Sequence, residues 1–154
     1  MSETRTVLPD VAAMQAYGAA IAAKLRVGDV VALEGGLGAG KTTLARAILA
    51  ALGHDGEVPS PTFTIIETYD APPLRLPVVH ADFYRLENPG ELMEIGLDDY
   101  REGAVLLAEW PDHAGGFATE AGCLTIALEL VGESGTGGRI AIARGGADWV
   151  GRMP

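Results

Sequence analysis

The sequence is poor in lysine and in positive charge. Its 154 residues include only two lysines, Lys24 and Lys41, and 11 Lys and Arg in total against 21 Asp and Glu, for a formal net charge of −10. Proteins that bind nucleic acid on their own neutralise its phosphates with clustered lysine and arginine side chains. The charge balance therefore argues against direct binding of RNA or DNA.

Cysteine and long apolar runs are also scarce. Cys123 is the only cysteine, so the chain cannot form an internal disulfide, and no His/Cys cluster offers a zinc site. No segment approaches the ~18 uninterrupted apolar residues of a membrane span. The length and the 48% hydrophobic content suit one globular domain, which we place at residues 1–154. We expect a cytoplasmic protein that does not contact membranes.

Hydrophobic periodicity predicts an α/β domain with a central mixed sheet. The expected elements are a strand at 4–8, a helix capped by Asp10 and ended by Gly28, a strand at 30–33, a helix through 44–52, a hairpin of 63–69 and 76–83, a short helix capped by Asn88 and closed by Gly96, a strand at 104–108, and a strand pair of 123–131 and 139–144. The tail after Arg144 has no readable periodicity.

A glycine-rich loop joins the second expected strand to the second helix. Gly35-x-x-x-x-Gly40-Lys41-Thr42 satisfies the Walker A pattern, in the strand–loop–helix context that this pattern requires. Glycines let successive backbone N–H groups point at phosphate oxygens, and the helix N-terminus adds partial positive charge. Lys41 would reach the β and γ phosphates and the Thr42 hydroxyl would bind Mg²⁺. The predicted nucleotide-binding residues here are Gly35, Gly36, Leu37, Gly38, Ala39, Gly40, Lys41, Thr42 and Thr43.

Two carboxylates follow apolar strands, where a P-loop site needs an acid for the metal. Asp82 follows the mostly apolar run at 76–81, and Glu109 follows the strand at 104–108. Together they indicate a pair that holds Mg²⁺ and positions water, and either one suits the metal. His80 is interpreted as a packing histidine.

Missing motifs narrow the class of P-loop protein. The guanine-reading motif Asn-Lys-x-Asp is absent, since Asn88 is the only asparagine and proline follows it. The arginines are scattered, whereas nucleotide kinases gather several on a lid. An adenine nucleotide is therefore favoured, used for hydrolysis or as a switch. A small kinase and a nucleotide-gated interaction module remain as alternatives.

An ordered set of motifs resembles the TsaE (YjeE) ATPases, which support threonylcarbamoyladenosine (t6A) modification of tRNA. The resemblance covers about residues 7–131 and rests on five segments: Leu37-Gly38-Ala39-Gly40-Lys41-Thr42-Thr43, Ser60-Pro61-Thr62-Phe63, His80-x-Asp82-x-Tyr84-Arg85-Leu86, Glu91 with Gly96 and Asp99-Tyr100, and Glu109-Trp110-Pro111. Departures include Gly36, where many members carry Asp, and Ala12, Ala13 and Met14 near the expected adenine position.

The resemblance implies a three-layer P-loop NTPase fold that binds ATP, with Mg²⁺ held by Thr42 and Glu109. It implies that Asp82 and Lys41 take part in ATP hydrolysis. It also implies that Ser60 and Thr62, in a switch-like loop, contact the nucleotide. It also implies that the chain forms a complex with the proteins TsaB and TsaD and that its hydrolysis of ATP resets this complex. The chain would then act on tRNA only indirectly, through these partners.

Overall fold

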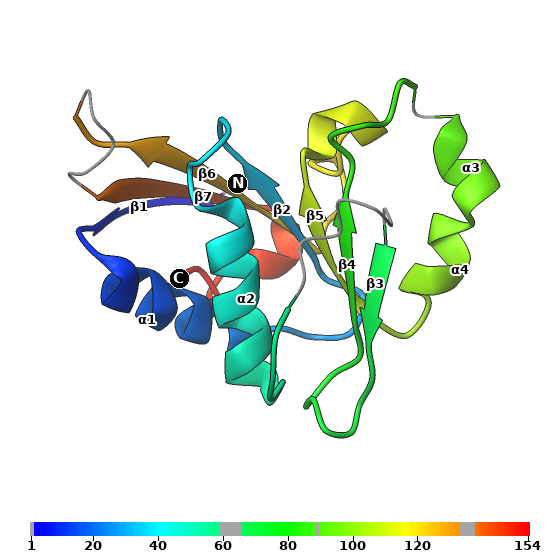
Figure 1. Cartoon of the computed structure of the whole chain (residues 1–154), viewed down its shortest axis with the longest axis horizontal. Helices are drawn as coiled ribbons and strands as arrows, with labels where there is room; N and C mark the ends of the chain where they lie inside the picture. The colour runs from blue at the N-terminus through cyan, green and yellow to red at the C-terminus, as the bar shows by residue number, and fades with distance from the viewer. Residues whose placement is uncertain (1, 59–65, 89, 133–137) are drawn as a thin grey trace.

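A seven-stranded sheet forms the centre of the protein (Figure 1). The computed structural model describes residues 2–58, 66–88, 90–132 and 138–154. The strands are β1 (Ser2–Leu8), β2 (Val30–Glu34), β3 (Ile66–Tyr69), β4 (Val78–Asp82), β5 (Val105–Glu109), β6 (Cys123–Leu130) and β7 (Arg139–Gly145). The helices are α1 (Val11–Ala22), α2 (Lys41–Leu52), α3 (Glu91–Ile95) and α4 (Leu97–Arg101), with 3₁₀ turns at Pro111–Ala114 and Ala147–Trp149.

The sheet is mixed, as predicted. Its order is β1-β7-β6-β2-β5-β4-β3. Strand β2 is parallel to β5 and β6, and β4 is parallel to β5, whereas the pairs β1–β7, β6–β7 and β3–β4 are antiparallel. The parallel strands β2, β4 and β5 end at one edge of the sheet, so the residues that follow them lie close together.

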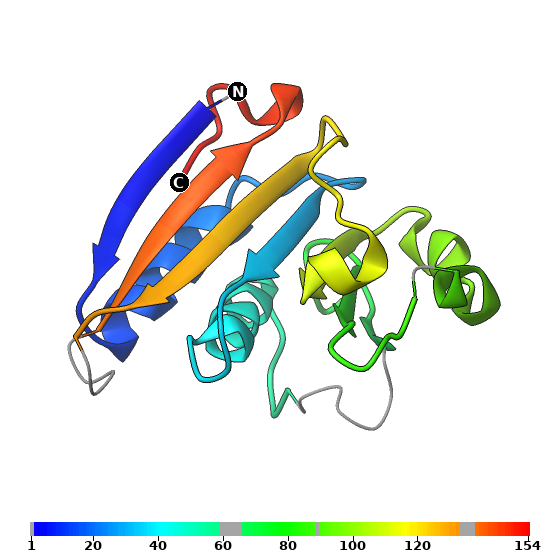
Figure 2. The ribbon, with the colours of Figure 1, turned by 90° about the horizontal axis from the view of Figure 1, so that it is seen from above.

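Hydrophobic clusters on both faces of the sheet confirm the three-layer α/β class. Helices α1 and α2 lie side by side on one face (Figure 2), where Ile21, Leu44 and Ile48 are fully buried. Phe83 and Leu97 pack on the opposite face with the turn at Pro111–Ala114. Strand β5 contributes alternate residues to both clusters and is buried along its whole length, as its apolar run predicted. No helix in the described part of the chain is long and apolar enough to cross a bilayer.

Short-range sequence signals predict the positions of most helices and strands correctly. The Asp10 side chain accepts a hydrogen bond from Ala13 N at 2.8 Å, so it caps α1 as predicted. Gly53 ends α2 in the left-handed conformation, with φ of 117°. The expected hairpin is present as β3 and β4, although its predicted residues 63–65 lie outside the described residues.

Two of the predicted helix boundaries are wrong. Helix α1 ends at Ala22 rather than at Gly28. After it, Lys24 N and Leu25 N donate to carbonyls three residues earlier, and the Arg75 guanidinium, from the hairpin, donates to the carbonyls of Ala22 and Leu25. The N-cap of α3 is Gly90, not Asn88, whose backbone carbonyl instead accepts from Glu91 N at 3.2 Å. Helix α4, which follows immediately after Gly96, was not predicted.

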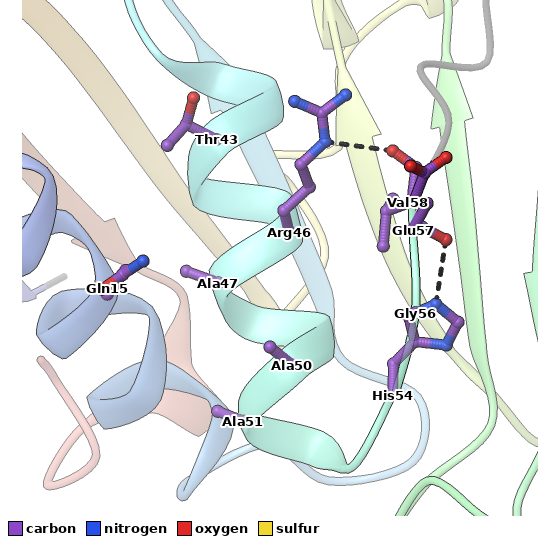
Figure 3. Close-up of a pocket in the computed structure, with 10 residues that line it drawn as sticks. All are labelled: Gln15, Thr43, Arg46, Ala47, Ala50, Ala51, His54, Gly56, Glu57 and Val58. Carbon is purple, nitrogen blue, oxygen red and sulfur yellow. Dashed lines mark hydrogen bonds between the residues drawn. The ribbon is translucent and has the colours of Figure 1, made fainter.

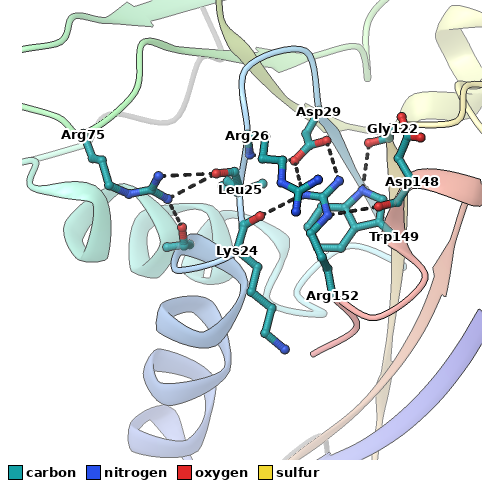
Figure 4. Close-up of polar contacts among 10 residues, drawn as sticks. Lys24, Leu25, Arg26, Asp29, Arg75, Gly122, Asp148, Trp149 and Arg152 are labelled. Atoms are coloured by element: carbon teal, nitrogen blue, oxygen red, sulfur yellow. Dashed lines mark hydrogen bonds and ion pairs between the residues drawn. The ribbon is translucent and has the colours of Figure 1, made fainter.

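The tail after β7 folds back onto the body of the protein (Figure 4). Trp149 is fully buried, and its indole N–H donates to Gly122 O at 2.9 Å. The Arg152 guanidinium makes two bonds to the carboxylate of Asp29, at 2.8 and 3.1 Å, and a third to Lys24 O at 2.7 Å. These contacts tie the tail to the turn between α1 and β2.

Candidate functional site

The Walker A loop spans the gap between β2 and α2, at the edge where the parallel strands end (Figure 1). Its shape requires glycine at two positions. Gly35 has φ of 142°, and a Cβ there would lie 2.7 Å from Leu128 O. Gly40 has φ of 106°, and a Cβ there would lie 3.0 Å from the Met14 methyl group. No described side chain caps α2, so the N–H groups of its first turn are available to an anion.

Lys41 is the first residue of α2 and is only 6% exposed. Its ammonium group donates to the carbonyls of Gly35 and Gly36 at 2.7 and 2.8 Å, so the side chain curls back over the loop. It also lies 4.3 Å from the centre of the Trp110 ring. Burial lowers the pKa of Lys41, while the charges of Glu109 and Asp82 oppose that shift.

The two predicted acids meet beside the loop. Asp82 and Glu109 are direct partners in the β4–β5 register, and Glu109 is 2% exposed. The Thr42 hydroxyl donates to Glu109 Oε1 at 2.8 Å, which joins the helix to the end of β5. Burial raises the pKa of Asp82, the hydrogen bond from Tyr84 N–H lowers it, and the charge of Glu109 raises it again.

The fold thus brings Lys41, Thr42, Asp82 and Glu109 together. The predicted residues Ser60 and Thr62 lie outside the described residues. Leu37, at the tip of the loop, is 72% exposed. Among the described residues there is no group of three or more His, Cys, Asp or Glu side chains suited to a metal ion.

Three contacts of the site were not predicted. His80 is not only a packing residue, because its Nε2 lies 2.6 Å from Glu109 Oε2. Its place two residues before Asp82, on the same face of β4, was a signal for this role. Trp110 turns the chain after β5 with φ of 56° and lies under the Lys41 ammonium group. Arg139 donates to the carbonyls of Ala39 and Gly38 at 2.9 and 3.1 Å, and no local pattern marks a residue so distant in sequence.

Two hollows adjoin the loop and share Thr43. The smaller, of about 220 Å³, is lined by Leu8, Pro9, Asp10, Val11, Met14, Gly40, Thr43, Gly138 and Arg139. The larger, of about 920 Å³, follows α2 away from the loop, between Gln15 and the segment from His54 to Val58 (Figure 3). Among the described residues, Thr43 is the only predicted site residue that lines the larger hollow, whereas Gly40 and Thr43 both line the smaller one.

Comparisons with known proteins show which proteins this chain resembles. A family model described as threonylcarbamoyl adenosine biosynthesis protein TsaE matches residues 8–138. A protein of Haemophilus influenzae named tRNA threonylcarbamoyladenosine biosynthesis protein TsaE is 38% identical over an alignment of 130 residues, which covers 80% of this chain and 81% of that protein. A protein of Bacillus subtilis with the same name is 45% identical over 107 residues, 69% of this chain and 64% of that one. The crystal structure of YdiB from Bacillus subtilis aligns with a TM-score of 0.74 at 31% identity and covers 98% of this chain and 90% of that chain.

Proposed function

The chain belongs to the TsaE family and has a role in the biosynthesis of threonylcarbamoyladenosine in tRNA, and we propose that it acts there as a magnesium-dependent ATPase. The observation that carries the proposal is the convergence of Lys41, Thr42, Asp82 and Glu109 at the Walker A loop. Each of these side chains has the charge or the oxygen that phosphoryl transfer needs.

The phosphates of ATP would bind over the loop. The uncapped first turn of α2 offers backbone N–H groups, and the Lys41 ammonium group lies beside the same turn. Lys41 would exchange the carbonyls of Gly35 and Gly36 for phosphate oxygens. Because phosphate oxygens carry full charge, they are stronger acceptors than peptide carbonyls.

Thr42 and Glu109 fit a magnesium ion. Their oxygens lie 2.8 Å apart, both are the hard ligands that Mg²⁺ prefers, and Mg²⁺ is usually held by one or two protein groups together with substrate phosphates. Bound there, the ion would neutralise the charge of the phosphates. Asp82 would accept a hydrogen bond from the attacking water, and its raised pKa makes it a better proton acceptor than a free aspartate.

The smaller hollow is the proposed place for adenine. It opens directly beside Gly40 and Thr43, so a nucleotide whose phosphates bind the loop would have its base within reach. Pro9 and Met14 offer apolar surface to the base, and Arg139 already contacts the loop from β7.

Partner proteins would connect this ATPase to tRNA. A net charge of −10 and only two lysines leave little attraction for RNA phosphates. We propose TsaB and TsaD as the partners, with TsaD transferring the threonylcarbamoyl group and ATP hydrolysis by this chain resetting the complex.

ATP turnover measured with and without TsaB and TsaD tests the proposal. We expect slow release of inorganic phosphate by the chain alone, faster release with both partners, and none when EDTA removes Mg²⁺. Phosphate that appears on an acceptor molecule would indicate a kinase instead. ATP that tightens partner binding without being consumed would indicate a nucleotide-gated module, and either result would contradict the ATPase assignment.

A further inference from the structure

His80 lies inside the sheet, directed to the same side as the nucleotide site. Its neighbours Val79 and Ala81 join the hydrophobic cluster on the opposite face, so His80 and Asp82 are directed to the face that α2 covers. In the β4–β5 register His80 pairs with Leu107 and Asp82 pairs with Glu109. His80 and Glu109 are therefore diagonal neighbours on one face, close enough for long side chains to meet.

The Glu109 carboxylate is held at both of its oxygens. Oε1 accepts from the Thr42 hydroxyl at 2.8 Å, and Oε2 lies 2.6 Å from His80 Nε2. Glu109 is 2% exposed and His80 is fully buried, so water does not compete for these bonds. With one oxygen fixed by the imidazole, the carboxylate can present only the other to Thr42.

The two ring nitrogens of His80 have different surroundings. Among the residues that the structure describes, His80 Nδ1 has no hydrogen-bond partner. An ionised carboxylate can only accept hydrogen bonds, so Nε2 is the donor when Glu109 is ionised. Within the described residues, the only hydrogen-bond partner of the buried His80 ring is therefore Glu109.

We propose that His80 is a positioning residue for the proposed metal ligand Glu109. By occupying Oε2, it orients the carboxylate so that Oε1 faces the Thr42 hydroxyl and the cation that the two would share. The inference rests on the proposed function, because it takes a metal–nucleotide complex to bind there. Residues that orient a metal ligand in this way commonly change metal affinity by ~10- to 100-fold when they are removed.

The variants His80→Gln and His80→Asn separate this role from simple filling of the core. Glutamine can bring its amide N–H near the position of His80 Nε2, whereas asparagine is one methylene shorter and ends near Nδ1. We would measure Mn²⁺ binding to each protein with saturating ADP by electron paramagnetic resonance, and ADP binding in EDTA by calorimetry. His54→Gln is the matched control, because His54 lies after α2, where its ring nitrogen is 3.1 Å from the Glu57 carbonyl and its ring centre is 4.9 Å from that of Tyr69.

We expect His80→Asn to weaken Mn²⁺ binding by about tenfold or more, while His80→Gln and His54→Gln stay near the native value. ADP binding in EDTA should be the same in all four proteins. Native Mn²⁺ affinity in His80→Asn would overturn the proposal, as would equal losses of Mn²⁺ binding in both His80 variants. Failure of the unaltered protein to bind Mn²⁺ with ADP would instead overturn the proposed function.

A measurement on the native protein keeps the proposal testable if the variants do not fold. The ¹⁵N resonances of the His80 ring report which nitrogen carries the hydrogen. We expect it on Nε2 both in the EDTA-treated protein and in the Mg²⁺–ADP complex. A hydrogen on Nδ1, with Nε2 facing the carboxylate unprotonated, would overturn the proposal.

Discussion

Replacing Lys41 with alanine is expected to slow ATP hydrolysis by ~10²- to 10³-fold, the usual effect of removing a donor aimed at charge that develops in the transition state. Lys41 is nearly buried at the start of α2, and its ammonium group is held over the loop by two carbonyls. No other lysine in the chain can take its place, since Lys24 is far away in the turn after α1. Single-turnover release of phosphate from ATP measures the effect.

Lys24→Ala is the matched control for this experiment. Lys24 is exposed, and its ammonium group donates to Met153 O at 2.8 Å, away from the loop. The same substitution there should leave the hydrolysis rate unchanged. A Lys41→Ala protein that folds and retains the native rate would show that the Walker A loop is not the site of hydrolysis.

Replacing Arg152 with alanine is expected to lower the free energy of unfolding by ~3–5 kcal/mol, as is typical when one member of a buried ion pair is removed. The side chains of Arg152 and Asp29 are 9% and 5% exposed. Without the guanidinium, the Asp29 carboxylate would keep only the hydrogen bond from Arg26 N. The cation–π contact between Arg152 and Trp149, 4.2 Å from the ring centre, would also be lost. Urea unfolding followed by circular dichroism measures the change.

Arg144→Ala provides the comparison for this second prediction. Arg144 also forms an ion pair, with Glu3 at 3.3 Å, but the two side chains are 48% and 61% exposed. Exposed pairs contribute ~1 kcal/mol or less, so this variant should lose little stability. Equal stability of the Arg152 and Arg144 variants would contradict the structural role given to the tail.

The parts of the fold that follow from short-range chemistry were predicted from the sequence, and the parts set by distant contacts were not. Asp10 caps α1 and Gly53 ends α2 through contacts within a few residues, so their patterns were sufficient. At the end of α1, carbonyls accept hydrogen bonds from Arg75, which approaches from the β3–β4 hairpin. The tail has no periodicity because single side chains, Trp149 and Arg152, anchor it rather than a repeated face.

The same distinction applies to the site. The Walker A loop is continuous in sequence, so Lys41 and Thr42 were assigned from spacing alone. Asp82 and Glu109 were recognised because both follow apolar strands. The contacts of Glu109 with Thr42 and His80 depend on β5 lying between β2 and β4 in the sheet, and the sequence does not specify this order.

The central claim, that nucleotide chemistry at Lys41 supports tRNA modification, is tested most directly by the t6A content of cellular tRNA. The native protein would be depleted from cells that express Lys41→Ala, Lys24→Ala or the unaltered chain at equal abundance, and t6A would be measured by mass spectrometry of digested tRNA. The account predicts that t6A disappears with Lys41→Ala and persists with the other two. Native levels of t6A in the Lys41→Ala cells would contradict it.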